Sequence, residues 1–122
     1  MTCSTEYAAG WCQNTVDNKW GICNEGEWAT ASLPTGWVKI ATQVARPVKA
    51  VTIYDRACDE QVLTGHLEFS DGSANIAFGA LENTGTTGLK ITLPATKNLT
   101  WVKVVIDTSS GPNPGLGEVV IE

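Results

Sequence analysis

The sequence predicts an all-β fold, an antiparallel β-sandwich of the jelly-roll kind, in a single domain over residues 1–122. Two observations lead to this prediction. Apolar and polar residues alternate in the second half of the chain, as where Leu67 and Phe69 alternate with Glu68 and Ser70, which is typical of half-buried strands. Turn-forming residues separate these segments and no helical stretch interrupts them, so strands joined by turns are expected to form the core.

Nine strands are expected in chain order, over residues 2–7, 28–31, 36–41, 48–54, 64–69, 74–79, 89–93, 99–107 and 116–121. Residues 8–27 are rich in Gly, Asn and Asp and predict one long loop. Pro34, Pro47, Pro94 and Pro112 each stand between two expected strands. Proline has no backbone N–H to donate to a ladder, so these positions predict breaks.

The sequence also predicts how the connections are distributed. Asp71-Gly72 between two alternating segments indicates a hairpin with a two-residue type I′ turn. If neighbouring strands run antiparallel, loops 55–63, 80–88 and 108–115 meet at one end of the sandwich, and residues 94–98 lie at the other end with the hairpin turn. The first set carries more functional side chains, so a site is expected there.

The four cysteines are Cys3, Cys12, Cys23 and Cys58, and their spacing matches no zinc pattern. The sequence favours two disulfides, Cys3–Cys12 within the N-terminal loop and Cys23–Cys58 between that loop and residues after Tyr54. Such bonds indicate an oxidising compartment, hence a secreted or extracellular protein. Two other connectivities remain open, and the alternative is buried free thiols in a cytosolic protein.

Composition excludes several partners. The net charge of −5 disfavours nucleic acid and anionic membrane surfaces, because both attract clustered Lys and Arg. No apolar run approaches the roughly 20 residues that a membrane-spanning helix needs. Binding of nucleic acid and insertion into a membrane are therefore not expected.

Catalytic motifs are scarce, and the chain is not expected to be an enzyme. His66 is the one histidine, and it shares a strand face with Glu68, so it is expected to be solvated. Neither a nucleophile elbow nor a phosphate-binding loop is present. Asp55, Asp59 and Glu60 could form an acid–base pair of a hydrolase, but Arg56 beside them favours a salt-linked loop.

Aromatic residues favour a binding function. Trp11 and Trp20 lie in polar loop sequence, where an indole ring offers an apolar face to the C–H side of a pyranose. The alternative is that these two rings pack beneath the N-terminal loop. Trp28 and Trp37 lie in expected strands and are assigned to the core, and Trp101 is expected to face away from it.

Several sequence blocks resemble one known superfamily: Glu27-Trp28-Ala29-Thr30, Gly36 to Ile40, Val51 to Arg56, Leu67 to Gly72, Phe78 to Leu81 and Gly115 to Val119. In order and spacing the chain is similar to discoidin-like domains of the F5/8 type C, galactose-binding-like superfamily over nearly its whole length. The resemblance implies a β-sandwich jelly roll, either a carbohydrate-binding module or a lectin. Such a domain binds glycans without catalysis through loops at one end.

The resemblance places the sugar beside Tyr54-Asp55-Arg56 and the 17–24 segment. The residues expected around it are Trp20, Trp11, Tyr54, Asp55, Arg56, Asp59, Glu60 and Asn113. Arg56 either donates to sugar hydroxyls or pairs with Asp55 or Asp59. A shallow, wet site binds weakly, so multivalency is expected. The alternative function is a protein-adhesion or assembly module that uses the same loops.

The resemblance also implies a structural Ca²⁺ ion, held between an Ala-x-Asp-Gly loop and a glutamate near the C terminus. Thr15-Val16-Asp17-Asn18 and Glu118 stand at these places, so Asp17, Asn18 and Glu118 are the expected metal residues. Thr15 replaces Ala, and Asn18 replaces Gly. Asn tolerates the left-handed conformation, which preserves the turn. The alternative is that disulfides stabilise the loop in place of the metal.

Overall fold

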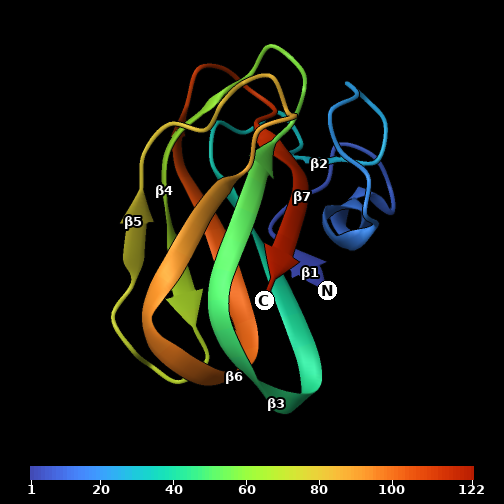
Figure 1. Cartoon of the computed structure of the whole chain (residues 1–122). Helices are drawn as coiled ribbons and strands as arrows, with labels where there is room; N and C mark the ends of the chain where they lie inside the picture. Colours follow the sequence, from blue (N-terminus) through green and yellow to red (C-terminus); the bar gives the residue numbers. More distant parts are fainter.

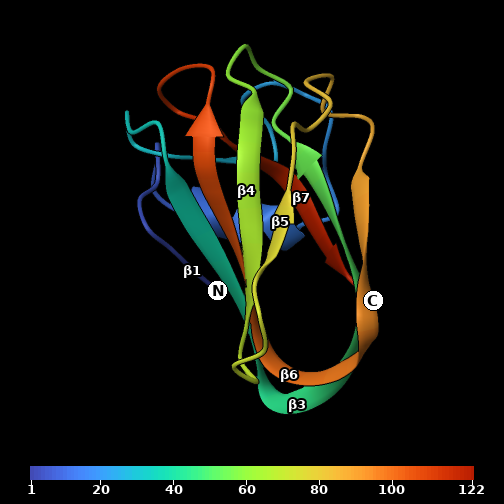
Figure 2. The same ribbon diagram turned by 90° about the vertical axis from the view of Figure 1, so that its left-hand side faces the viewer.

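The computed structural model describes all 122 residues as a β-sandwich (Figures 1 and 2). The elements are β1 (Thr2–Cys3), the 3₁₀ helix η1 (Trp11–Val16), β2 (Trp28–Ala29), β3 (Gly36–Asp55), β4 (Val62–Phe69), β5 (Ile76–Phe78), β6 (Leu89–Ser109) and β7 (Gly115–Ile121). Hydrogen bonds connect the strands in the order β2-β7-β3-β6-β4-β5, with β1 on β3. Every pairing is antiparallel, as predicted.

Two long bent strands fold this hydrogen-bonded sheet into two layers. The first part of β3 pairs with the last part of β6, next to β4 and β5, and the last part of β3 pairs with the first part of β6, next to β7. Both ribbons bend together at the lower end of Figure 2. The strands therefore pass from one layer to the other without leaving the ladder, and the predicted sandwich is confirmed.

The predicted breaks at Pro47 and Pro94 are wrong, because both prolines lie within continuous strands. Pro47 is paired opposite Asn98, between register shifts at Ala41/Arg46 and Val48/Ala50. Such irregularities bend a ladder and tolerate a missing N–H, so proline here marks a bend rather than an end. Nine predicted strands become seven for this reason.

The hairpin between β4 and β5 is confirmed, but its predicted turn is wrong. Leu67 pairs with Ile76, so the connection is longer than two residues. Of the two turn residues only Gly72 has positive φ, at 75°, whereas type I′ requires it at both. The Asp71 carboxylate instead accepts the Ser73 N–H at 3.0 Å, a local bond typical of an aspartate-initiated turn.

The prediction that residues 8–27 form one long loop is wrong in part, because this segment contains η1. Cys12 and Thr15 are its buried residues, and their spacing of three matches the period of a 3₁₀ helix. This short helix packs against β7 and β2. The N-terminal segment is thus held on one edge of the sandwich.

Whether a tryptophan is buried depends on which face of its strand it lies on, since lying in a strand does not by itself bury it. Trp28 is fully buried, as predicted, and its Nε1 donates to the Thr5 carbonyl at 2.8 Å. The assignment of Trp37 to the core is wrong: it is half-buried, while the next residue, Val38, is fully buried. The Nζ atom of Lys103 lies 4.8 Å from the Trp37 ring centroid. Trp101 is also half-buried.

His66 lies in β4, and its side chain is 22% exposed rather than fully solvated. Its Nδ1 lies 2.7 Å from Asp107, and its Nε2 lies 2.9 Å from Glu68. Burial lowers the pKa of His66, but the hydrogen bonds with the two carboxylates outweigh that effect and raise it. His66 thus serves an ion-pair network on the sheet. No helix of the structure is long and apolar enough to cross a membrane.

Candidate functional site

The predicted clustering of the loops is confirmed, because the connections β3–β4, β5–β6 and β6–β7 meet at the upper end in Figure 1. A shallow hollow of about 410 Å³ opens there between the loops and the N-terminal segment. Its lining residues are Tyr7, Cys23, Asn24, Arg56, Ala57, Cys58, Asp59, Glu60 and Asn113. Four of them, Arg56, Asp59, Glu60 and Asn113, belong to the predicted sugar-binding set.

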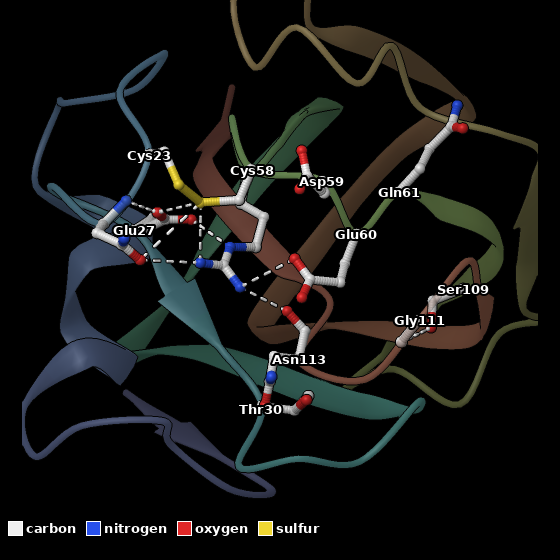
Figure 3. Close-up of polar contacts among 12 residues, drawn as sticks. Cys23, Glu27, Thr30, Cys58, Asp59, Glu60, Gln61, Ser109, Gly111 and Asn113 are labelled. Carbon is white, nitrogen blue, oxygen red and sulfur yellow. Dashed lines mark hydrogen bonds and ion pairs between the residues drawn. A yellow bond between two sulfur atoms is a disulfide. The ribbon is translucent and has the colours of Figure 1, made fainter.

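The disulfide Cys23–Cys58, which lines the hollow, is confirmed (Figure 3). It joins positions 35 residues apart and brings the N-terminal segment to the loop end. The second predicted disulfide is absent: Cys3 and Cys12 are free thiols. Their sulfurs and a Glu6 carboxylate oxygen lie within 4.8 Å of one another. Burial raises the pKa of both thiols and keeps them protonated.

The Arg56 guanidinium is the centre of a hydrogen-bond network that includes Glu27 and Asn113, both labelled in Figure 3. Its Nε donates to Glu27 Oε2 at 2.6 Å, its Nη1 to the Asn113 carbonyl at 2.6 Å, and its Nη2 to Asn24 Oδ1 at 3.2 Å. Only 6% of the side chain is exposed. The structure therefore uses Arg56 to connect three loops, and the predicted pairing with Asp55 or Asp59 is replaced by one with Glu27.

Asp55 does not face the hollow, because it is fully buried at the end of β3. Its carboxylate accepts the N–H of Arg56 at 3.0 Å and of Val62 at 3.3 Å. Burial raises its pKa to about 7, although these hydrogen bonds and Arg56 act in the opposite direction. Asp55 thus shapes the β3–β4 loop from inside, and its predicted contact with sugar does not fit this position.

The accessible side chains in the hollow include one aromatic ring and two carboxylates. Tyr7 is 59% exposed, Asp59 is exposed and the Glu60 side chain is 24% exposed. The Oδ1 atom of Asn113 accepts the Ser32 N–H at 2.6 Å, so half of that amide is engaged. An exposed ring beside carboxylate acceptors suits a ligand with one apolar face and several hydroxyl or amino donors.

The two predicted stacking tryptophans lie apart. Trp11 packs on Tyr7, with ring centroids 5.5 Å apart, and so supports the ring that lines the hollow. Trp20 stacks on Tyr54 at 5.0 Å and is 38% exposed. Trp20 lines a second shallow hollow, of about 300 Å³, with Asn18, Lys19, Ile22 and Glu25. The predicted set is therefore divided between two neighbouring surfaces.

Sequence reasoning missed Tyr7, Asn24 and Glu27. Tyr7 carried the signal that selected Trp11, an aromatic residue in polar sequence outside the strong strands. Glu27 stands directly before the buried Trp28, and a charged residue at such a position is a candidate for a buried ion pair. Asn24 has φ of 65°, a conformation that asparagine adopts more readily than most residues.

The predicted metal residues lie together where the N-terminal segment meets β7. Glu118 is 3% exposed, and its Oε1 has no hydrogen-bond partner. Burial raises its pKa to about 7, and the nearby Asp17 charge adds to the rise, while backbone hydrogen bonds lower it. Asn18 has φ of 62°, the left-handed conformation expected of it. A buried carboxylate with a free oxygen beside a second carboxylate fits a hard cation.

Comparisons with known proteins agree with this architecture. The family model described as "Domain of unknown function (DUF7402)" matches residues 2–121. No curated protein sequence matches the chain. Among solved structures, chitosan-binding module 1 of a chitosanase/glucanase from Paenibacillus sp. IK-5 superposes with a TM-score of 0.73 at 14% identity, covering 99% of this chain and 92% of the module.

Two further structures are similar over nearly their whole length. The family 32 carbohydrate-binding module of C. perfringens NanJ, in complex with galactose, has a TM-score of 0.74 at 14% identity, with 98% of this chain and 90% of the module covered. The lectin domain of lectinolysin, in complex with Lewis B antigen, has a TM-score of 0.73 at 20% identity, with 99% and 89% covered. The resemblance to discoidin-like modules is confirmed at the level of the fold.

Proposed function

The chain belongs to the DUF7402 family, and we propose that it is a non-catalytic glycan-binding domain, a lectin or carbohydrate-binding module. Its site is the hollow at the loop end of the sandwich. The observation that carries this proposal is the exposed Tyr7 ring beside Asp59 and Glu60. The similar solved structures bind chitosan, galactose and Lewis B antigen with the same fold.

In this proposal the hollow is a preformed receptor. Tyr7, supported by Trp11, stacks on the C–H face of a pyranose, and Asp59 and Glu60 accept hydrogen bonds from its hydroxyl or amino groups. Arg56 holds the loops in place and does not touch the ligand. Because a shallow, hydrated site gives weak affinity, the domain acts through several linked copies or as part of a larger protein. The Cys23–Cys58 disulfide supports an extracellular location.

The buried position of Asp55 supports a non-catalytic function. A hydrolase of the paired-carboxylate type needs two carboxyl groups on either side of the bond that is cleaved. Asp55 is fully buried and bonded to backbone N–H groups, which leaves only the neighbours Asp59 and Glu60 in the hollow.

We also propose that Asp17 and Glu118 hold a structural Ca²⁺ ion. The free Oε1 of Glu118 and the adjacent Asp17 charge support it, because a hard cation with oxygen ligands would balance both carboxylates. Backbone carbonyls of the turn at Asn18 would complete the set. The ion would attach the N-terminal segment to β7 and take no part in contact with sugar.

The proposal is tested on a glycan array with the oxidised domain, with and without EDTA. Selective binding to one glycan class is expected, and Tyr7→Ala should weaken it at least about tenfold without lowering the melting temperature, since Tyr7 is largely exposed. Trp101→Ala, a half-buried aromatic of β6, is the matched control and should retain binding. Trp20→Ala tests which hollow binds the glycan, because it should weaken binding only if the second hollow, which Trp20 lines, also contacts the glycan.

A blank array with folded, oxidised protein at high density would overturn the proposal. Capture of a protein partner that sugars do not displace would then favour the adhesion or assembly function. Loss of binding in EDTA together with a lower melting temperature would support the Ca²⁺ ion as a structural element.

A further inference from the structure

We propose that the hollow selects amino sugars, glycan units with a free, protonated amine, over neutral or acidic sugars. This inference rests on the proposed function and names the ligand class of the same site. It follows from three features of the hollow: its one cation is buried and neutralised by Glu27, its accessible charged groups are anionic, and its aromatic ring is exposed.

The Arg56 guanidinium is buried and is largely engaged by the protein itself. A guanidinium carries five N–H groups, and four of those of Arg56 donate to Glu27, the Asn113 carbonyl, Asn24 Oδ1 and, at 3.1 Å, Cys58 Sγ. The Nη1 atom also lies 3.7 Å from Glu60. The charge of Arg56 is balanced by the buried Glu27 carboxylate, so a uronate in the hollow would meet no free positive charge.

The charge on the loops around the hollow is negative. Asp59 and Glu60 line the hollow, and Glu25 and Glu82 lie in neighbouring loops. Besides Arg56 and Lys19, the Lys and Arg residues all lie in β3 and β6: Lys39, Arg46, Lys49, Lys90, Lys97 and Lys103. The loops therefore carry few cationic side chains, and the loop end attracts cations and repels anions.

An amino sugar matches the accessible groups better than a neutral sugar does. An ammonium group forms charge-assisted hydrogen bonds with carboxylates, which are about twice as strong as neutral ones. The exposed face of Tyr7 attracts the same cation and the C–H face of the ring. The N-acetylated form of the same sugar loses the charge and keeps the ring, so the amine alone decides the preference.

The test is titration calorimetry with short oligomers of glucosamine, their fully N-acetylated counterparts and oligogalacturonides, at about pH 6 and at low salt, which screens charges least. Glucosamine oligomers are expected to bind at least about tenfold more tightly than the acetylated ones, and the difference should shrink as salt is added. Oligogalacturonides are expected not to bind.

Variants separate a site from general attraction to an acidic protein. Asp59→Asn and Glu60→Gln should each remove most of the preference for the amine. Glu122→Gln changes the net charge by the same unit outside the hollow, at a side chain 52% exposed, and should leave the preference intact. Equal loss in all three variants would mean attraction by net charge alone and would overturn the inference.

The failure of the inference differs from the failure of the proposed function. Acetylated or galacturonic oligomers that bind as tightly as the amino forms would overturn the amino-sugar preference and leave glycan binding in place. If none of the three series bound, and a neutral glycan array were also blank, the proposed function itself would fail. Tyr7→Ala should abolish binding of the amino oligomers, since the stacking ring belongs to the same hollow.

Discussion

Two buried glutamates at the loop end, Glu27 and Glu118, differ in what balances their charge. They are 1% and 3% exposed. Glu27 bonds to Arg56 through Oε2, and its Oε1 accepts the Asn24 N–H. Glu118 has a second carboxylate, Asp17, as its charged neighbour, and its Oε1 is unbonded. Arg56 neutralises Glu27 within the chain, whereas Glu118 needs a proton or a cation from solution to balance its charge.

The N-terminal segment is therefore attached to the sandwich in two different ways, one at each of these glutamates. On the Glu27 side, the ion pair and the Cys23–Cys58 disulfide connect the segment to the β3–β4 loop. On the Glu118 side, the connection depends on solution conditions. Mutations should therefore have their largest effects on the first side, and pH and metal ions should act mainly on the second.

The largest effect is expected from Glu27→Gln. Removing one partner of a buried ion pair leaves the other charge uncompensated, which typically costs about 3–5 kcal/mol. The free energy of unfolding, measured by urea titration, should fall by that amount, and glycan binding should fall because Arg56 no longer fixes the loops.

Glu60→Gln is the matched control, since Glu60 is partly exposed and lies 3.7 Å from the same guanidinium. It should lower stability by less than about 1 kcal/mol. If Glu27→Gln and Glu60→Gln were equally stable, the buried carboxylate that Arg56 neutralises would contribute no more to stability than the partly exposed one.

The second effect concerns the disulfide. The Cys23→Ser, Cys58→Ser double variant opens a loop of 35 residues and should lose about 3–4 kcal/mol on a chain-entropy estimate. The double variant Cys3→Ser, Cys12→Ser removes no bond from the structure and should lose less. A larger loss in the second pair under oxidising conditions would mean that Cys3 and Cys12 join in solution, as the sequence predicted.

Much of the fold could be predicted from sequence because alternation reports directly on which residues face the core. Leu67 and Phe69 are buried, as their alternation required. Prolines at 47 and 94 misled the prediction, because a proline signals a lost N–H without saying whether the strand ends or bends. That choice depends on whether the partner strand bends with it, which is a property of two distant segments.

The site was predicted in location but only partly in chemistry. Asp59, Glu60 and Asn113 lie at the hollow, because loop clustering follows from strand direction. Asp55 and Arg56 were expected at the surface and are buried. The burial of Arg56 depends on its ion pair with Glu27, 29 positions away in the sequence, and no local pattern in the sequence links the two.

The smallest effect is expected in the pH dependence of folding stability that Glu118 causes, and it tests the contrast between Glu118 and Glu27 most directly. The folded-state pKa of Glu118, about 7, lies above its ordinary value of 4.5, so the folded protein binds this proton more tightly than the unfolded chain. The protonated Glu118 carboxyl therefore contributes about 1–3 kcal/mol of stability below about pH 4.5, and this contribution is lost as the pH rises through 7. Glu118→Gln should remove this slope, measured as the difference from wild type because Asp55 titrates in the same direction.

Calcium should reverse the order of the two proteins. Without metal at about pH 8, Glu118→Gln should be the more stable, since it carries no buried charge. With Ca²⁺ the wild type should gain stability, more so as the pH rises, because the ligands must be deprotonated. If the Gln variant gained as much from Ca²⁺ as the wild type, Glu118 would not be a ligand. If the pH slope persisted in that variant, the free charge would belong to another group, and the contrast with Glu27 would lose its basis.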